Sequence, residues 1–490
     1  MIKRAIIDCY TDEPSGLGVP PFLGTWPREV GGRYRDNPIY LNIDDIRLLS
    51  KGYELQEKDI YNFTGKTNIS FLNRQYHYKD LVDIFHNLDQ VIIIIGMQTP
   101  GKYLSAKPGT ILEIKKLLSP YKNIRKILTG PSTKFGTQGM GGEYALIPSL
   151  DDFDEIRDIE FTNYTDLQKV YLKASTLDIK NKDKKIVEIE TSRGCNRIKG
   201  CSFCTEPLKN KLTYRDENFI IEEIKQYISL GYKYFRLGKQ SCIFSYMGGD
   251  EKRIEKLLKG IKALNPKVLH IDNCNPVMVN EKRTKLFTKY LTAGSTAAFG
   301  IESFDENVIN LNNLNSDLEA SIEAIKIINK YGKDRDKNGN PILLPGINII
   351  LGLIGETEET LEKNFYYLKY ILDSNLLVRR INIRQVVPYK GTYLYEKAGL
   401  TFLNKNKKFY KAWIDKVRHE IDLKMLEKVF PKGTILTDLY SVCYEGNVTF
   451  LRQFGSYSII VGVKKRLPIN QFFQARIIGH NLRSLVGEIV

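Results

Sequence analysis

Short apolar runs and longer amphipathic stretches alternate along most of the chain. The short runs have the length of strands, as at residues 91–95 and 186–190. The longer stretches repeat apolar residues at helical spacing, most clearly at residues 217–230 and 358–372. Strands that alternate with helices are typical of parallel sheets. The pattern therefore predicts an α/β protein.

The first predicted unit is a Rossmann-like α/β domain at residues 1–183. Its clearest strands lie at residues 5–8, 91–95 and 124–128, and Gly130 and Pro131 follow the last of them. Ligands of such sheets bind at the carboxyl ends of strands, although glycines at strand ends also serve simply as tight turns. A charged, apolar-poor segment at residues 181–185 marks the domain boundary.

The second predicted unit, residues 184–402, repeats the β/α alternation six times. Its expected strands lie at residues 186–190, 232–237, 268–271, 296–301, 346–353 and 381–387. Six βα units predict a partial (β/α)6 barrel whose functional groups gather at the carboxyl-terminal rim.

The last part of the chain changes character. Residues 403–428 are predicted to form a polar, helical linker, and residues 429–490 contain short β-prone runs at 435–442, 448–451, 457–461 and 473–478. Short strands separated by glycines are typical of a small β-barrel of the TRAM or OB kind.

Charge and length limit the classes of function. The formal charge of +16 permits a polyanionic partner, and residues 429–490 carry seven Lys or Arg against three acids. No apolar run approaches the roughly 20 residues of a membrane helix, and the amino terminus lacks the pattern of a signal peptide. We expect a cytoplasmic protein without membrane contact. The sequence does not predict an oligomeric state.

Three of the seven cysteines lie within ten residues, directly after a predicted strand: Cys195, Cys201 and Cys204. Thiolates suit zinc or an iron–sulfur cluster, and three of them leave a coordination position open. A structural zinc site would need a fourth ligand, for which Cys242, Cys274 or His270 are candidates. The cysteines outside the trio are too scattered for a second cluster: Cys9, Cys242, Cys274 and Cys443.

The Cys-x5-Cys-x2-Cys spacing, with aromatic Phe203 before the last cysteine, resembles the cluster loop of the radical S-adenosylmethionine (SAM) superfamily. The usual spacing there is Cys-x3-Cys-x2-Cys, so this loop is two residues longer. The resemblance implies a [4Fe-4S] cluster whose open iron binds SAM, and cleavage of SAM to a 5′-deoxyadenosyl radical. It also implies an electron donor such as ferredoxin or flavodoxin.

Segments that follow the cysteine loop also resemble segments of this superfamily, and they occur in the same order along the chain. Gly300-Ile301-Glu302-Ser303 lies on the fourth expected strand, and a Gly-Leu-Ile-Gly-Glu segment begins at Gly352. The usual Gly-Gly-Glu segment is absent, and Gln240 and Ser241 stand in its place. By resemblance, the cofactor-binding residues are Phe203, Gln240, Ser241, Glu302, Ser303, Gly352, Glu356, Arg384, Val387 and Pro388. No catalytic side chain is singled out.

The domain order resembles archaeal radical SAM proteins that have an amino-terminal cobalamin-binding-like domain and a carboxyl-terminal small β domain. The Asp-x-His-x-x-Gly signature that supplies an axial histidine to cobalamin is absent. Cobalamin bound without a histidine ligand is therefore an open alternative.

The small β domain also resembles barrels with which RNA-modifying radical enzymes grip tRNA. Our main hypothesis is modification of RNA, with RNA contacts expected from Arg452, Lys464, Lys465, Arg466, Arg476 and Arg483. One alternative is a cobalamin-dependent radical SAM methyltransferase acting on a peptide, lipid or small molecule. Another is a non-catalytic RNA-binding or zinc-stabilised protein.

Overall fold

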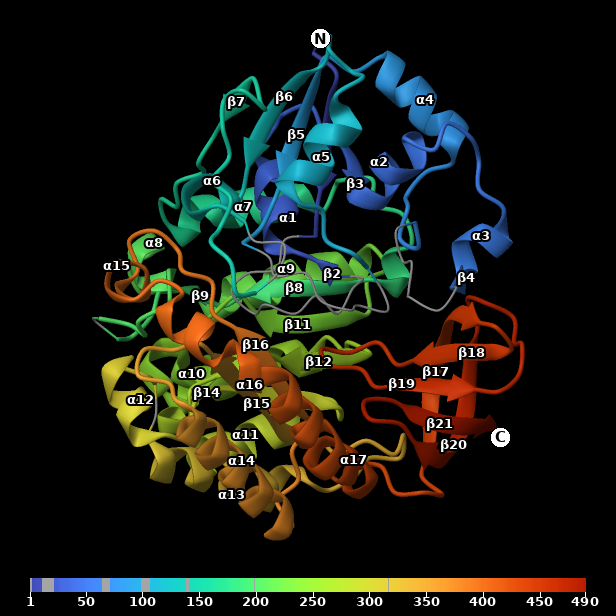
Figure 1. Ribbon diagram of the computed structural model, residues 1–490. Helices are drawn as coiled ribbons and strands as arrows, with labels where there is room; N and C mark the ends of the chain where they lie inside the picture. The colour runs from blue at the N-terminus through green and yellow to red at the C-terminus, as the bar shows by residue number, and fades with distance from the viewer. Residues whose placement is uncertain are drawn as a thin grey trace.

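The computed structural model describes residues 2–10, 22–63, 71–97, 106–137, 141–197, 199–315 and 317–490. An α/β region at the top of Figure 1 lies against a central barrel, and a small β-barrel packs at the side. Within the described part of the chain, every helix is too short or too polar to span a bilayer.

The amino-terminal region is built on a five-stranded sheet that is parallel throughout, in the order β3-β1-β5-β6-β7. The strand order reverses between β1 and β5, which makes this junction the topological switch point of a doubly wound sheet. Its strands are β1 (Arg4–Asp8), β3 (Ile39–Asn42), β5 (Gln90–Ile94), β6 (Arg125–Thr129) and β7 (Glu155–Ile156).

Helices accompany this sheet, and local capping sets their ends. Asn42 ends β3 and caps α2, because its side chain accepts hydrogen bonds from Asp44 and Asp45 N–H groups while Asp45 bonds back to the Asn42 N–H. The helices are α1 (Thr25–Arg33), α2 (Ile43–Leu49), α3 (Glu57–Tyr61), α4 (Tyr78–His86), α5 (Ile111–Leu118), α6 (Ser132–Phe135) and α7 (Tyr164–Ala174).

The central region is a partial barrel of parallel strands. The ladder of backbone hydrogen bonds breaks at Asp272, so the third strand is split into β12 and β13, which belong to adjoining sheets. The strands are β8 (Ile186–Glu190), β11 (Tyr234–Gly238), β12 (Val268–Ile271), β13 (Asn273–Cys274), β14 (Ser295–Glu302), β15 (Leu343–Leu351) and β16 (Arg380–Gln385). The predicted (β/α)6 fold class is confirmed.

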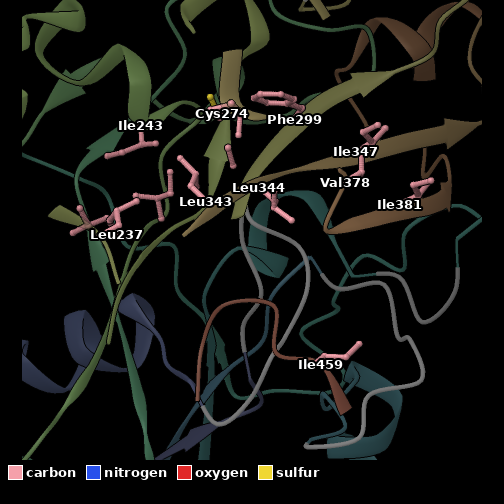
Figure 2. Close-up of a cluster of buried hydrophobic side chains, with 14 of the residues drawn as sticks. Leu237, Ile243, Cys274, Phe299, Leu343, Leu344, Ile347, Val378, Ile381 and Ile459 are labelled. Atoms are coloured by element: carbon pink, nitrogen blue, oxygen red, sulfur yellow. The ribbon is translucent and has the colours of Figure 1, made fainter. Parts of the chain in front are cut away.

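Helices between these strands cover the barrel, and a large buried apolar cluster joins the strands to these helices. Figure 2 shows Leu237, Phe299, Leu343 and Ile347 within one buried cluster. The helices are α8 (Glu206–Lys209), α9 (Glu217–Ser229), α10 (Glu251–Ala263), α11 (Glu281–Tyr290), α12 (Glu306–Leu311), α13 (Leu318–Gly332), α14 (Glu358–Asp373) and α15 (Tyr393–Lys397).

The predicted linker is helical: α16 (Thr401–Val417) continues through a π turn (Arg418–Asp422) into α17 (Leu423–Val429). Beyond it, five strands close into a small barrel, because β17 pairs with both β18 and β20. The predicted small β-barrel is thereby confirmed. Its strands are β17 (Ile435–Glu445), β18 (Val448–Arg452), β19 (Ile460–Val463), β20 (Phe472–His480) and β21 (Leu485–Ile489).

Two short amino-terminal strands pair with the other regions. β2 (Phe22–Leu23) runs parallel to β8 at the edge of the central barrel, and β4 (Asn62–Phe63) runs parallel to β17 of the small barrel. The amino-terminal region is thus joined by backbone hydrogen bonds to both regions that follow it.

Candidate active site

The cysteine loop begins at the carboxyl end of β8 and is closed by a two-residue ladder of β9 (Ser192–Arg193) with β10 (Thr213–Tyr214). Gly194 has a φ of +84°, and a Cβ there would lie 2.5 Å from Leu212 N. The Gly194 N–H donates to the Glu206 carboxylate at 2.8 Å. Only glycine fits this backbone, which directs the next residue, Cys195, into the loop.

The three thiols lie close enough to influence one another electrostatically. Burial raises the pKa of Cys201 to about 12, although Arg197 opposes the shift. Burial and the neighbouring Cys201 raise the pKa of Cys204 as well. Binding to iron would therefore require these thiols to release protons, as metal ligation generally does.

The described side chains do not form a site for a single metal ion. Among these residues, no group of three or more His, Cys, Asp or Glu side chains has that geometry. Both ring nitrogens of His270 are engaged, with Ala293 O and the Ser456 N–H. Cys242 and Cys274 interact with each other. Three thiolates that each bind a different iron suit a four-iron cluster.

Two asparagines after α12 hold the cysteine loop. Arg197 donates to Cys201 Sγ at 3.4 Å and to Asn313 O at 2.6 Å, while Asn313 Nδ2 donates to Gly200 O at 2.6 Å. Ser202 Oγ donates to Asn312 Oδ1 at 2.7 Å. Sequence reasoning missed these residues, and their only signal is the Asn-Asn pair that follows the Glu-Ser segment.

A buried ionic cluster holds the loop from the other side. Arg193, immediately before Gly194, donates to Glu190 at 2.7 Å and to Glu29 of α1 at 2.7 Å. Both carboxylates are fully buried. Phe161 lies 4.5 Å from the Arg193 guanidinium. The amino-terminal region thus fixes the residue that leads into the cluster loop.

Glu302 is the predicted cofactor residue with the clearest structural signal. A bulge ends the regular pairing of β14 here, and Glu302 has a left-handed φ of +65°. Its Oε2 is buried and has no hydrogen-bond partner among the described residues. Burial raises its pKa to about 8, and Arg384 opposes the shift. The charge of Glu302 also raises the pKa of Cys201. A buried acceptor beside the thiols fits the ammonium or hydroxyl donors of SAM.

Ser241 is the predicted cofactor residue that contacts the cluster loop directly, since its Oγ donates to Gly194 O at 3.0 Å. Gln240 is buried and bonded to Thr191 Oγ1 and Leu237 O. Phe203 is half-buried, and Val387 and Pro388 are buried after β16.

Two other predicted contacts have structural partners. Glu356 accepts from the Gly352 N–H at 2.9 Å and from the Tyr410 hydroxyl of α16, so it anchors that helix. Ser303 Oγ donates to Asn364 Oδ1 at 3.3 Å and accepts from the Asp305 N–H. Direct contact of Glu356 or Ser303 with SAM stays a prediction, and the hydrogen bonds within the protein already use both side chains.

The carboxyl end of the amino-terminal sheet faces the barrel rim. Met97, three residues beyond β5, accepts a hydrogen bond from Thr205 at 3.8 Å through its sulfur and from Tyr389 at 3.4 Å through its carbonyl. The Gly142 N–H donates to Val386 O at 2.9 Å. Thr205 directly follows Cys204, so the carboxyl edge of the amino-terminal sheet lies beside the cluster loop of the barrel.

The predicted RNA contacts divide into two groups. Arg452 is 5% exposed and lies within the small barrel, where burial lowers its pKa to about 10. The prediction that Arg452 contacts RNA is therefore wrong, because its position on β18 points it into the fold. The other predicted contacts are exposed: Lys464, Lys465, Arg466, Arg476 and Arg483.

The fold and the cysteine loop together define a radical SAM enzyme. The Radical SAM superfamily model matches residues 189–365, from β8 to α14. The chain belongs to this superfamily, whose members use a [4Fe-4S] cluster and SAM.

Two archaeal relatives match along nearly their whole length. An uncharacterised protein of Methanocaldococcus jannaschii is 40% identical over 100% of this chain and 94% of its own, and one of Archaeoglobus fulgidus is 35% identical over 99% and 90%. The radical SAM methyltransferase TsrM of Kitasatospora setae, solved with cobalamin and a [4Fe-4S] cluster, has a similar fold. Its TM-score is 0.51 at 10% identity, covering 80% of this chain and 74% of TsrM.

Proposed function

We propose that the protein is a cobalamin-dependent radical SAM enzyme, with the corrinoid between the amino-terminal sheet and the cluster loop, and that it transfers a methyl group. The observation that carries this proposal is the switch point of the β3-β1-β5-β6-β7 sheet, whose carboxyl edge meets the barrel rim at Met97 and Thr205. Ligands of doubly wound sheets bind at this edge. TsrM combines the same two cofactors on a similar fold.

Unsatisfied hydroxyl groups at that edge fit a polar ligand. Thr129 ends β6, Ser132 begins α6 and Thr137 follows this helix, and each hydroxyl is buried without a hydrogen-bond partner among the described residues. Buried polar groups nearly always have hydrogen-bond partners. Three buried hydroxyls without a partner within nine residues therefore fit a bound ligand that supplies those partners. The amide and hydroxyl groups of a corrinoid are suitable partners.

The division of roles follows from the positions of the side chains. Cys195, Cys201 and Cys204 would hold the cluster. Glu302 and Arg384 would bind SAM, and the electrostatic interactions of Glu302 with Cys201 and with Arg384 support this assignment. A bound corrinoid supplies a methyl carrier next to the radical chemistry. An external electron donor such as ferredoxin or flavodoxin would reduce the cluster.

The test is binding of hydroxocobalamin by the anaerobically reconstituted protein, followed by its visible absorption after gel filtration. We expect retention, and a several-fold weaker affinity for Thr129→Val and Ser132→Ala, since each loses about 1 kcal/mol of hydrogen bonding to the ligand. Without cobalamin these variants should be as stable as the parent, because their hydroxyls have no partner to lose. Ser119→Ala, at the exposed end of α5, is the control. Failure to retain cobalamin would refute the proposal.

A second candidate is that RNA is the substrate. The exposed Lys464, Lys465 and Arg466 on a closed five-stranded barrel favour it. Lys464→Glu combined with Lys465→Glu should weaken binding of tRNA and flatten its salt dependence. If tRNA binding is absent or insensitive to both salt and these changes, the small barrel has another role.

A further inference from the structure

A pocket of about 340 Å³ lies between the small β-barrel and the amino ends of the central strands. On the central side, it is lined by the start of β12, by the loops before β14 and β15, and by Arg379 before β16. On the other side, it is lined by residues 453–455 and 457–459, Asp438 and Phe472. The cluster loop is at the opposite, carboxyl ends of these strands, so this pocket is separate from the active site. Its volume is within the range of small-molecule sites, roughly 300–1,000 Å³.

The pocket contains an arginine without an acidic partner. Arg379 Nη2 donates to the Tyr457 carbonyl, and no described carboxylate forms an ion pair with this guanidinium. Burial lowers the pKa of Arg379 to about 10. The two acids in the wall are already used: Asp336 accepts backbone N–H groups of its own loop, and Asp438 pairs with Lys267 at 3.1 Å. An anionic group would complete the surroundings of Arg379.

The pocket also has an exposed aromatic face. Phe472 at the start of β20 is 48% exposed, and the Lys267 ammonium lies 5.0 Å from its ring centre. Behind it, Phe454 is 6.1 Å away and stacks on Tyr234 at 4.6 Å, which gives Phe472 a rigid support. A fixed, accessible ring beside a cation is a typical platform for a nucleobase.

We propose that this pocket binds a nucleotide, with the base against Phe472 and the phosphate against Arg379 and Lys267. The nucleotide is either free or one unit of a single-stranded RNA. The inference depends neither on cobalamin nor on the exposed lysines of the small barrel.

The experiment is calorimetric titration of the reconstituted full-length protein with AMP, adenosine and a hexameric oligoadenylate. We expect AMP to bind, and Phe472→Ala to weaken both AMP and adenosine by about tenfold through loss of stacking. Arg379→Gln should weaken AMP by about tenfold and leave adenosine unchanged, which also shows that this variant is folded. Arg125→Gln is the matched control, because it removes one positive charge at an exposed residue of β6 that pairs with Glu155 and does not line the pocket. It should leave AMP binding unchanged.

Comparing the affinities for oligoadenylate and AMP shows whether the nucleotide is free or part of RNA. Binding of oligoadenylate at least tenfold tighter than AMP, with the same dependence on Phe472 and Arg379, indicates RNA, and equal or weaker binding indicates a free nucleotide. The proposal is overturned if AMP and oligoadenylate both fail to bind at millimolar concentration. It is equally overturned if Arg125→Gln weakens AMP binding as much as Arg379→Gln does, because the loss would then come from the change in net charge and not from a contact in the pocket.

Discussion

Glu223 joins the amino-terminal region to the central barrel through two buried arginines. It lies on α9, and its carboxylate pairs with Arg28 of α1 and with Arg215, all three side chains being 0% exposed. Arg28 also donates to Glu188 O on β8, the strand that leads into the cysteine loop. Glu223→Gln would leave two buried guanidinium groups facing a neutral amide.

The expected loss is large because the partners cannot reach water. Removing one member of a buried pair costs about 3–5 kcal/mol, whereas exposed pairs contribute up to about 1 kcal/mol. At roughly 2–4 °C per kcal/mol for large domains, Glu223→Gln should lower the apparent melting temperature by about 10 °C. Glu222, its exposed neighbour, accepts one hydrogen bond from Gln168, and Glu222→Gln makes the same chemical change at the surface.

The assay is thermal unfolding of the apo proteins under anaerobic conditions, with limited proteolysis at increasing temperature as a second readout. Because the chain has several regions, proteolysis reports whether the amino-terminal region separates first. A shift for Glu223→Gln within about 2 °C of that for Glu222→Gln would refute the reasoning, since burial would then not control the cost.

Two further predictions concern the cluster and pH. Cys201→Ala should reduce the iron content after reconstitution to background and abolish SAM cleavage. Cys443 is buried in the small barrel, so Cys443→Ala should retain both iron and SAM cleavage. Equal iron content in the two variants would exclude Cys201 as a cluster ligand. Burial lowers the pKa of His270 to about 4 from 6.5, so the unfolded chain binds the proton first, and stability present above pH 6.5 is lost as pH falls towards 4. His270→Gln should reduce the fall in melting temperature between pH 7 and pH 5. His86 is exposed, so His86→Gln should leave this fall unchanged. If the parent and both variants show the same fall in melting temperature, the reasoning is contradicted.

The longest elements could be predicted because their apolar pattern is local. The strand predicted at residues 91–95 is β5, and the helix predicted at 358–372 is α14, with ends shifted by one residue. β2 and β4 could not be predicted, since each is two residues long and exists only because β8 or β17 offers an edge. Such strands depend on the tertiary fold.

The candidate site divides in the same way. The cysteines and Glu302 lie in local motifs, so sequence alone indicates them. Asn313 contacts the loop from 113 residues away, and Glu29 reaches Arg193 across 164 residues. No local pattern encodes these contacts. Arg452 shows the opposite failure, since its charge suggested exposure and the strand register places it inside the barrel.

The pairing of β2 with β8 has a consequence for aggregation. A partial barrel has open edges, and an uncovered strand edge can recruit strands of other molecules. Residues 22–23 pair with that edge at Ile186 and Val187, so they prevent strands of other molecules from pairing there. A fragment beginning at residue 184 would expose the edge of β8, and the central barrel should aggregate whenever the amino-terminal region is removed or detached.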